Sequence, residues 1–406
     1  METGKMRTAI VGGGAAGFFL AVNLKEMMPE MEVCIFERSS KVLAKVKISG
    51  GGRCNCTNSF ALVKDMSQVY PRGHRLMKRL FNVFSHEDAY QWFERHGVPL
   101  TTQEDECVFP KAQDSQVIID CFLRECCCRG VEIQTGRAIQ TLEELSAYDF
   151  VCITTGGSPH GKGLEWLRQC GHEIAEPVPS LFTFNINDRQ LRDLMGTVVP
   201  HAAVQLAATK FRADGPLLIT HWGMSGPAIL RLSSYAARFL HEAAYRAPLL
   251  VNWTGLPESQ VREDLQLHAA QHSQKQLTTL APFDLPQRLW HYLLRKVLEN
   301  RTSCRWAEVG KKDMNRLINV LCNDSYQIDG RAAFKDEFVT CGGVALSSVN
   351  ASTLESKSRP NLYFAGEVLD IDGVTGGFNF QAAWTTAYTV AKAIALTDIC
   401  RSDRCR

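Results

Sequence analysis

The chain has 406 residues, 45% of them hydrophobic, which is enough to bury the cores of two or three domains without disulfides or metal ions. Its 45 basic and 43 acidic residues leave a net charge of +2, which gives no general reason to expect nucleic acid or an anionic membrane as a partner. The fifteen scattered cysteines suit a reducing cytoplasm better than a disulfide framework. The sequence has no run of about 18 apolar residues and no apolar run of signal-peptide length at its start. We therefore expect a cytoplasmic protein without a membrane span.

A glycine-rich motif lies between the first predicted strand, Arg7–Val11, and a helix that begins near residue 15. Its G-x-G-x-x-G pattern predicts a dinucleotide site, because the first glycine allows a sharp turn, the second a close approach to phosphate, and the third tight helix packing. The N-terminus of the following helix favours an anion such as a pyrophosphate. The predicted cofactor contacts in this motif are Gly12, Gly14, Ala15, Ala16 and Gly17.

The second predicted strand, Glu32–Glu37, ends in a carboxylate that lies 20 residues after Gly17. In a dinucleotide site, a carboxylate at this position accepts hydrogen bonds from the hydroxyls of the adenosine ribose. Glu37 therefore favours FAD or NAD over NADP, and the adjacent Arg38 is included in the predicted site. The alternative is a glycine-rich turn in another kind of α/β unit, with Glu37 as a solvated strand end.

The stretch from Arg38 to Asn58 contains three consecutive glycines and many donor side chains, so we expect a loop rather than a regular helix or strand. Such a loop could wrap the phosphates and ribityl chain of a cofactor. Its second half resembles the S-G-G-G-R-C-N-x-T-N signature of the YhiN/BaiN-like flavoproteins, often labelled the aminoacetone oxidase family of FAD-binding enzymes. The resemblance implies FAD contacts by Lys47, Ser49, Gly51, Gly52, Arg53, Cys54, Asn55, Thr57 and Asn58.

Two further segments carry the same resemblance. The strand Tyr148–Gly157 ends in a Gly-Gly turn, and the segment from Ala365 to Trp384 is similar to the family's A-G-E-V-L-D-x-D-G-x-T-G-G-[YF]-N-x-Q-x-A-W motif. The helix after this motif would point its N-terminus at the N1/C2 carbonyl of the flavin, where reduced flavin is negatively charged. We assign Glu367 to the ribityl hydroxyls or to waters that bridge the phosphates. The predicted contacts are Thr155, Gly156, Gly157, Gly366, Glu367, Asp370, Gly376, Gly377, Phe378, Asn379 and Gln381, with Arg137 and Ala138 on the adenine side.

No catalytic acid or base is identified by these motifs, but three residues are candidates. His221 is the best acid/base candidate, in a segment that resembles the family's T-H-x-G-L-S-G-P-A-I-L motif. Cys54 could serve as a redox partner or nucleophile near the flavin, or simply be a small buried apolar group. His160 could be an acid/base group, although we favour a solvated loop residue. The spacing of the cysteines predicts no metal site.

The predicted fold class is α/β, with a Rossmann-like FAD-binding domain that carries two dinucleotide motifs and an inserted domain that is β-barrel-like and helical. The βα rhythm stops near Phe182 and returns near Cys341. The basic residues near 295–316 are interpreted as a solvated helix face rather than an RNA site. The predicted divisions are 1–181 and 341–406 for the FAD-binding domain, 182–256 for the β-rich part of the insert, and 257–340 for its helical part.

These features predict an FAD-dependent oxidoreductase that transfers two electrons through its flavin to or from a small-molecule substrate, with NAD(P)H as a candidate electron donor. The alternatives are an amine or aminoketone oxidase that uses oxygen, and a non-enzymatic flavin-bound sensor. An NAD-only dehydrogenase would leave the two later glycine-rich motifs unexplained, and a tRNA-modifying flavoprotein would need a basic face. We expect no nucleic-acid or membrane partner, and the oligomeric state stays open.

Overall fold

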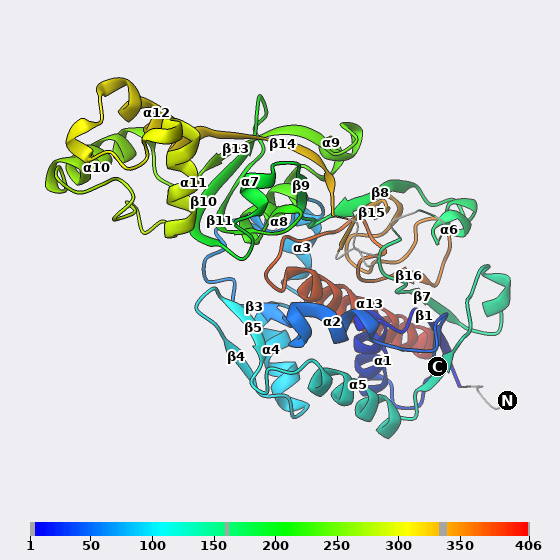
Figure 1. The fold of residues 1–406 in the computed structure, drawn as a ribbon. Helices are drawn as coiled ribbons and strands as arrows, with labels where there is room; N and C mark the ends of the chain where they lie inside the picture. Colours follow the sequence, from blue (N-terminus) through cyan, green and yellow to red (C-terminus); the bar gives the residue numbers. More distant parts are fainter. Residues whose placement is uncertain (1–4, 159–160, 162, 333–338, 405–406) are drawn as a thin grey trace. The chain divides into compact units, whose positions relative to one another are not determined.

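The computed structural model describes residues 5–158, 161, 163–332 and 339–404, which form two compact units (Figure 1). The first unit comprises Met1–Val178 together with Val339–Arg406, and the second comprises Pro179–Phe338. The second unit is therefore inserted into the chain of the first.

A parallel sheet of five strands forms the centre of the first unit, in the order β16-β7-β1-β2-β6. The interior strands are apolar because helices cover both faces of such a sheet. The chain passes from β1 to β2 on one side and later adds β7 on the other, so its direction switches at the carboxyl end of β1. Open α/β sheets bind their ligands at this point. The strands are β1 (Arg7–Val11), β2 (Glu32–Glu37), β6 (Glu132–Thr135), β7 (Phe150–Ile153) and β16 (Leu362–Phe364).

Helix α1 (Ala15–Met27) is largely buried, and it packs against α13 (Phe378–Arg404). The ring of Phe19 lies 4.6 Å from that of Trp92 and 5.0 Å from that of Trp384. This aromatic packing joins the helix of the first motif to the helix of the last one. The other helices of the unit are α2 (Ala44–Gly52), α3 (His74–Leu80), α4 (His86–Arg95), α5 (Gln116–Cys128) and α6 (Glu165–Gln169).

The expectation of an irregular loop between Arg38 and Asn58 is wrong for its middle part, which forms α2. Residues 44–48 contain no glycine or proline, and their helix formers complete a turn before the first glycine. The helical geometry breaks at Ser49, where ψ is 150°, and Gly50 and Gly51 then adopt φ values of 57° and 69°. The chain continues into β3 (Thr57–Asn58), which pairs with β5 (Cys107–Pro110); β5 also pairs with β4 (Leu100–Thr102).

The second unit contains a closed six-stranded barrel in the order β10-β11-β12-β9-β14-β13. Strand β14 pairs with β13 and β9, so it belongs to the barrel although the predicted division at 256/257 places it in the helical part. The predicted fold class, a Rossmann-like unit with an inserted barrel, is confirmed. The barrel strands are β9 (Phe184–Ile186), β10 (Val198–Leu206), β11 (Arg212–Ile219), β12 (Gly223–Ser225), β13 (Arg246–Asn252) and β14 (Asp324–Arg331).

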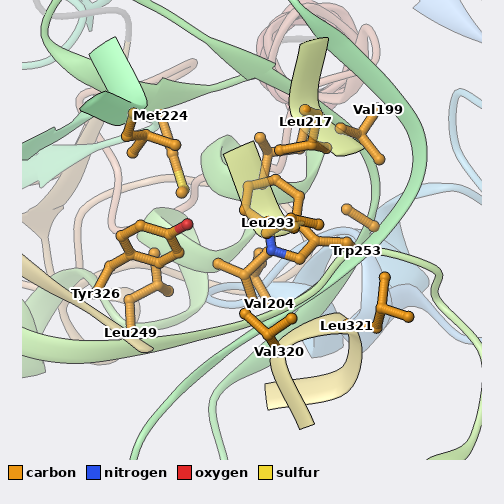
Figure 2. Packing of buried hydrophobic residues seen from close by; sticks show 14 of the residues in the cluster. Val199, Val204, Leu217, Met224, Leu249, Trp253, Leu293, Val320, Leu321 and Tyr326 are labelled. Carbon is orange, nitrogen blue, oxygen red and sulfur yellow. The ribbon is translucent and has the colours of Figure 1, made fainter. Parts of the chain in front are cut away.

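One hydrophobic core joins the barrel to the helices of this unit. Figure 2 shows barrel residues such as Leu217 and Leu249 converging with Leu293 of α11 and Leu321 of α12, and all four side chains are fully buried. The barrel and the helices therefore form one packed unit. Its helices are α7 (Arg189–Arg192), α8 (Pro227–Tyr235), α9 (Ala237–Glu242), α10 (Glu258–Gln271), α11 (Gln287–Leu298) and α12 (Lys311–Asn323), while β8 (Ile174–Ser180) pairs with β15 (Val339–Val344) where the chain leaves and rejoins the first unit.

The structure also bears on the expected absence of a membrane span and of a disulfide framework. Within the described residues, no helix is both long and apolar enough to cross a membrane. Every cysteine whose side chain the structure describes is free.

A charged cluster lies where α1, α4 and α5 meet, with Glu26 Oε1 2.8 Å from His96 Nε2 and 2.7 Å from Arg129 Nη2.

Candidate cofactor site

The first glycine motif adopts the geometry that its sequence predicts. A Cβ on Gly12, where φ is 120°, would lie 2.4 Å from the Thr154 carbonyl oxygen, and one on Gly17 would lie 2.1 Å from the Gly12 oxygen. By contrast, a Cβ on Gly14 would meet nothing within 4 Å. Gly14 is the N-cap of α1, no side chain of the described chain caps it, and the first turn carries no acidic residue. The open space and the positive end of the helix fit a pyrophosphate at Gly14, Ala15 and Ala16.

Glu37 lies beside this loop, at the carboxyl end of β2. Its Oε2 accepts a hydrogen bond from the Gly13 N–H at 2.9 Å, and its Oε1 accepts two from Ser39, at 2.8 Å each. A carboxylate offers about four acceptor sites, so capacity remains for a ribose hydroxyl. The backbone N–H of Arg137 donates to the Glu37 carbonyl oxygen at 2.9 Å, which places Arg137 and Ala138 on the same side. The residues predicted for the adenosine end are thus brought together, with Arg38 exposed beside them.

The second and third motifs, more than 300 residues apart, are joined by direct hydrogen bonds. The Thr57 hydroxyl donates to Gln381 Oε1 at 2.6 Å, and Asn58 Nδ2 donates to the Gly376 carbonyl at 3.1 Å. A Cβ on Gly377 would lie 2.2 Å from the Thr57 carbonyl oxygen, so only glycine permits this approach. The two motifs therefore form one structural element of the first unit. Trp384 Nε1 donates to the Cys56 carbonyl at 2.8 Å, and Asn55, with its amide turned to satisfy its neighbours, donates to the Thr57 carbonyl and accepts from the Gly377 N–H.

Gln381 and Asn379 hold this element in shape. Gln381 is fully buried, and its Nε2 donates to the Thr385 hydroxyl at 3.0 Å. Asn379 exchanges two hydrogen bonds with the backbone of Gly373, at 2.8 and 2.9 Å. The sequence predicts that these two side chains present donors to the flavin, whereas here they bond to the protein. The backbone N–H groups at the start of α13, which has no acidic residue in its first turn, remain to face a negative charge.

The segment from Val69 to Arg72, which no sequence motif marks, bonds directly to the third motif. The hydroxyl of Tyr70 donates to the Phe378 carbonyl at 2.9 Å, and the Val374 N–H donates to the Val69 carbonyl at 2.8 Å. Arg72 forms a two-pronged ion pair with Asp372, which is fully buried. Burial opposes the charge on Arg72, but the Asp372 carboxylate outweighs it and raises the pKa of the guanidinium. No local pattern marks Arg72 or Tyr70, because their partners lie about 300 residues away.

Glu367 lies where three chain segments meet. Its Oε1 accepts from the Thr340 N–H at 2.8 Å, and its Oε2 pairs with Lys45 Nζ at 2.8 Å. A Cβ on Gly157 would lie 2.6 Å from Glu367 Oε1, so the turn at Thr155, Gly156 and Gly157 packs against this carboxylate. Lys45 is a site residue that sequence reasoning missed, although it lies two residues from the predicted Lys47.

Several predicted contacts bind other parts of the protein. Lys47 Nζ donates to Gln116 Oε1 at 3.1 Å, and the Arg53 guanidinium lies 4.2 Å above the ring of Phe109. Ser49 donates to the Val46 carbonyl, whereas a Cβ on Gly51 or Gly52 would meet open space. Both cations thus hold the segment around residues 109–116 in this structure. Asp370 donates its backbone N–H to the Val344 carbonyl, and a Cβ on Gly366 would lie 2.8 Å from that of Ala16.

The catalytic candidates differ in their surroundings. Cys54 is fully buried, has a left-handed φ of 61°, and its Sγ lies 3.9 Å from that of Cys56. Burial raises the pKa of the Cys56 thiol well above its usual range, so Cys56 offers no accessible thiolate. His221 belongs to the other unit, where it is exposed in the turn between β11 and β12 with its ring 4.3 Å from that of Trp222. His160 lies outside the described residues. Among those described, no group of three or more His, Cys, Asp or Glu side chains could hold a metal ion.

A model of the family described as HI0933-like protein Rossmann domain matches residues 6–393 of this chain. The chain belongs to that family. The resemblance to the YhiN/BaiN-like flavoproteins is thereby confirmed, and the HI0933-like chain is an FAD-dependent oxidoreductase. The first-unit geometry accommodates this cofactor, since the adenosine end, the pyrophosphate end and the flavin end each have residues of matching chemistry.

Two relatives span nearly the whole of this HI0933-like chain. A 3-dehydro-bile acid delta(4,6)-reductase of Clostridium scindens is 26% identical, over 96% of this chain and 99% of its own length. A ribosomal RNA dihydrouridine synthase of Haemophilus influenzae is 27% identical, over 95% of this chain and 98% of its own length. Among solved structures, the 3-ketosteroid delta1-dehydrogenase from Sterolibacterium denitrificans is similar over 96% of this chain and 99% of its own, with 11% identity and a TM-score of 0.48.

Proposed function

We propose that this HI0933-like enzyme reduces a carbon–carbon double bond that is conjugated with a carbonyl group, in a small organic molecule, with NAD(P)H as the electron donor. The observation that carries the proposal is that two relatives with unrelated substrates are named for the same bond change. The delta(4,6) double bonds of a 3-dehydro bile acid are conjugated with its ketone. The uracil double bond that is saturated in dihydrouridine is likewise conjugated with a carbonyl.

The chain's own residues suit the reductive direction of this chemistry. FAD, when bound, supplies a hydride carrier between the electron donor and the substrate. The N-terminus of α13, which follows Gly376 and Gly377, places partial positive charge where a negatively charged group would lie. Thr57, Asn58 and Gln381 fix that loop, so its N–H groups are oriented before any ligand arrives.

We expect a small-molecule substrate rather than a nucleic acid. The net charge of +2 over 406 residues gives no general electrostatic attraction for RNA, whose binding depends on the neutralisation of phosphates. The name of the second relative makes RNA a substrate that an experiment should include.

The test uses the purified holoenzyme without oxygen. NADH and then NADPH are added while the visible flavin absorbance is followed, and the reduced enzyme is then mixed with 2-cyclohexen-1-one or a 3-oxo-4-ene steroid. We expect rapid bleaching by one nicotinamide and reoxidation by the enones, with the saturated ketone cyclohexanone as the matched control. The product should be the saturated ketone.

Four other outcomes would contradict the proposal. A flavin that an amine or aminoketone reduces, and that only oxygen reoxidises, would indicate an oxidase. Reoxidation by uridine in ribosomal RNA, with salt-sensitive binding, would indicate a nucleic-acid substrate. A flavin that no donor reduces would favour a sensor, and a colourless protein that binds NAD would contradict the assignment of FAD.

A further inference from the structure

Four aromatic side chains gather beside the start of α13. The ring of Phe60 lies 5.0 Å from that of Phe81, 4.9 Å from the imidazole of His86, and 5.1 Å from the ring of Phe378. We call this group the aromatic cluster. Phe378 is the first residue of α13 and is buried, whereas Phe60, Phe81 and His86 are each partly exposed. The cluster thus presents flat apolar surface next to the loop of the third motif.

A hydrogen-bonded link between the second and third motifs holds the cluster in place. Asn58 Oδ1 accepts a hydrogen bond from the Phe60 N–H at 2.9 Å, while its Nδ2 donates to the Gly376 carbonyl at 3.1 Å. One side chain therefore fixes Phe60 relative to the cofactor loop. Phe60 has a left-handed φ of 59°, which is strained for a bulky residue and is tolerated where the surroundings determine the backbone.

His86 is fixed just as firmly. It is the first residue of α4, directly after Ser85, whose backbone N–H donates to Asp88 in a capping box. The Thr385 hydroxyl of α13 donates to the Phe84 carbonyl at 3.0 Å, which ties this corner to the helix that begins at Phe378. These bonds fix the backbone at His86, and its imidazole packs against the rings of Phe60, at 4.9 Å, and Phe81, at 6.1 Å.

The two ring nitrogens of His86 have different surroundings. Nδ1 is buried and has no hydrogen-bond partner within the described chain. A buried N–H without an acceptor is less tolerated than a bare acceptor, so the proton resides on Nε2. Burial also lowers the pKa of the imidazole, against the weaker opposing effect of Glu87 and Asp88. His86 is therefore a neutral ring with one N–H available for a ligand.

We propose that the aromatic cluster binds the conjugated carbonyl group of the substrate, with Phe60 and Phe81 against its flat face and His86 Nε2–H donating to its oxygen. This inference rests on the proposed function. The alkene carbon far from the carbonyl would gain a C–H bond from the hydride that bound, reduced FAD would supply, and the π electron pair would shift toward the carbonyl oxygen. A neutral N–H donor stabilises this developing enolate without losing its own proton. Water then supplies the proton to the carbon next to the carbonyl.

The experiment compares H86F, which keeps the ring and removes the donor, with H86Q, whose amide retains an N–H near the position of Nε2. Reduced holoenzymes are mixed with 2-cyclohexen-1-one. We expect H86F to slow reoxidation by about 10²-fold, the usual effect of one lost donor at a developing oxyanion, and H86Q to recover part of the rate. Reduction by NAD(P)H and the amount of bound FAD should not change. H201F, which alters an exposed histidine of the other unit, is the matched control.

A second readout needs no turnover. Acetophenone has a flat ring and a carbonyl oxygen, and its binding to the oxidised holoenzyme can be measured by calorimetry. We expect H86F and F60L each to weaken its binding about tenfold, the effect of one hydrogen bond or one aromatic contact. Enone turnover and ketone binding that both survive H86F would overturn the inference while leaving the proposed function intact. A wild-type enzyme that ignores enones yet binds acetophenone through His86 would contradict the proposed function alone.

Discussion

The hydrogen bond between Thr57 and Gln381 joins the second and third motifs, and its removal tests whether Gln381 positions the cofactor loop. Gln381→Leu keeps the approximate volume but removes the acceptor at 2.6 Å from the hydroxyl of Thr57, a residue that is 1% exposed. The hydroxyl then has only a 3.4 Å contact with the Asn58 carbonyl. A buried donor that loses its partner costs about 1–3 kcal/mol, so we expect the free energy of unfolding to fall by that amount.

Substitution of the other hydrogen-bond partner, Thr57, makes the test quantitative. Thr57→Val removes the donor and should destabilise the unit by a similar amount, because it leaves the Gln381 oxygen buried without that donor. In the double variant both partners are apolar, so its cost should be smaller than the sum of the two single costs, by about 1–2 kcal/mol. A coupling of 1.4 kcal/mol is about a tenfold change in the folding equilibrium.

The assay is urea unfolding followed by far-ultraviolet circular dichroism, read at the transition that added FAD shifts to higher urea. FAD affinity is measured in parallel by the quenching of flavin fluorescence. A large loss of FAD affinity in Gln381→Leu, with unchanged stability of the apoprotein and no recovery in the double variant, would falsify the positioning role. That result would make Gln381 a direct cofactor contact.

Three further tests address other parts of the first unit. Gly17→Ala puts a Cβ 2.1 Å from a backbone oxygen, so we expect no FAD-loaded protein, whereas Gly14→Ala has room and should fold but retain less flavin on gel filtration. Arg72→Met removes the guanidinium from the fully buried carboxylate of Asp372 and should lower the free energy of unfolding in urea by about 3–5 kcal/mol. Burial opposes the charge of Glu26, but its imidazole and guanidinium neighbours outweigh this and lower its pKa. Glu26→Gln should therefore destabilise the protein by about 1 kcal/mol at pH 7. That difference should fade as the pH falls through about 4, because the folded state takes up the Glu26 proton less readily than the unfolded state.

Each of these tests has a result that would refute its reasoning. A stable, flavin-loaded Gly17→Ala protein would mean that the helix can shift away from the loop, and full flavin in Gly14→Ala would mean that phosphate does not approach there. An unchanged stability of Arg72→Met would show that water reaches the buried carboxylate. A difference for Glu26→Gln that grows in acid would reverse the sign of the pKa argument.

The parts of the fold that follow from local pattern could be predicted. The strand, glycine turn and helix of Arg7–Met27 need only neighbours in sequence, and so does the run of apolar residues in β2. Pro227 lies in the first turn of α8, where its missing N–H costs no hydrogen bond, so this helix start also depends on a local rule. The middle of the 38–58 segment was predicted wrongly as a loop, because residues 44–48 form a helical turn before the helical geometry of α2 breaks at Ser49 and the glycines that follow.

Long-range pairing set the limit of prediction. Strand β14 completes the barrel between β13 and β9, yet it follows three helices in the chain, and no local feature says that it returns to the barrel. Arg72 and Lys45 were missed at the site for the same reason, since their partners Asp372 and Glu367 are about 300 residues away. Composition identifies such residues only as charges on a helix or loop, where solvent is the default partner.

The strain at Phe60 shows how these distant contacts could shape function. A left-handed conformation costs a bulky residue about 1–2 kcal/mol, and the hydrogen bond from its N–H to Asn58 contributes about 1 kcal/mol in return. The hydrogen bond to Asn58 therefore does not exceed the cost of the left-handed conformation at Phe60. Its stability depends on the aromatic contacts with Phe81, His86 and Phe378, which come from three other segments of the first unit. A substitution that relaxed Phe60 would stabilise the local turn and turn the ring away from Phe378, so the strain is consistent with a position selected for binding rather than for stability.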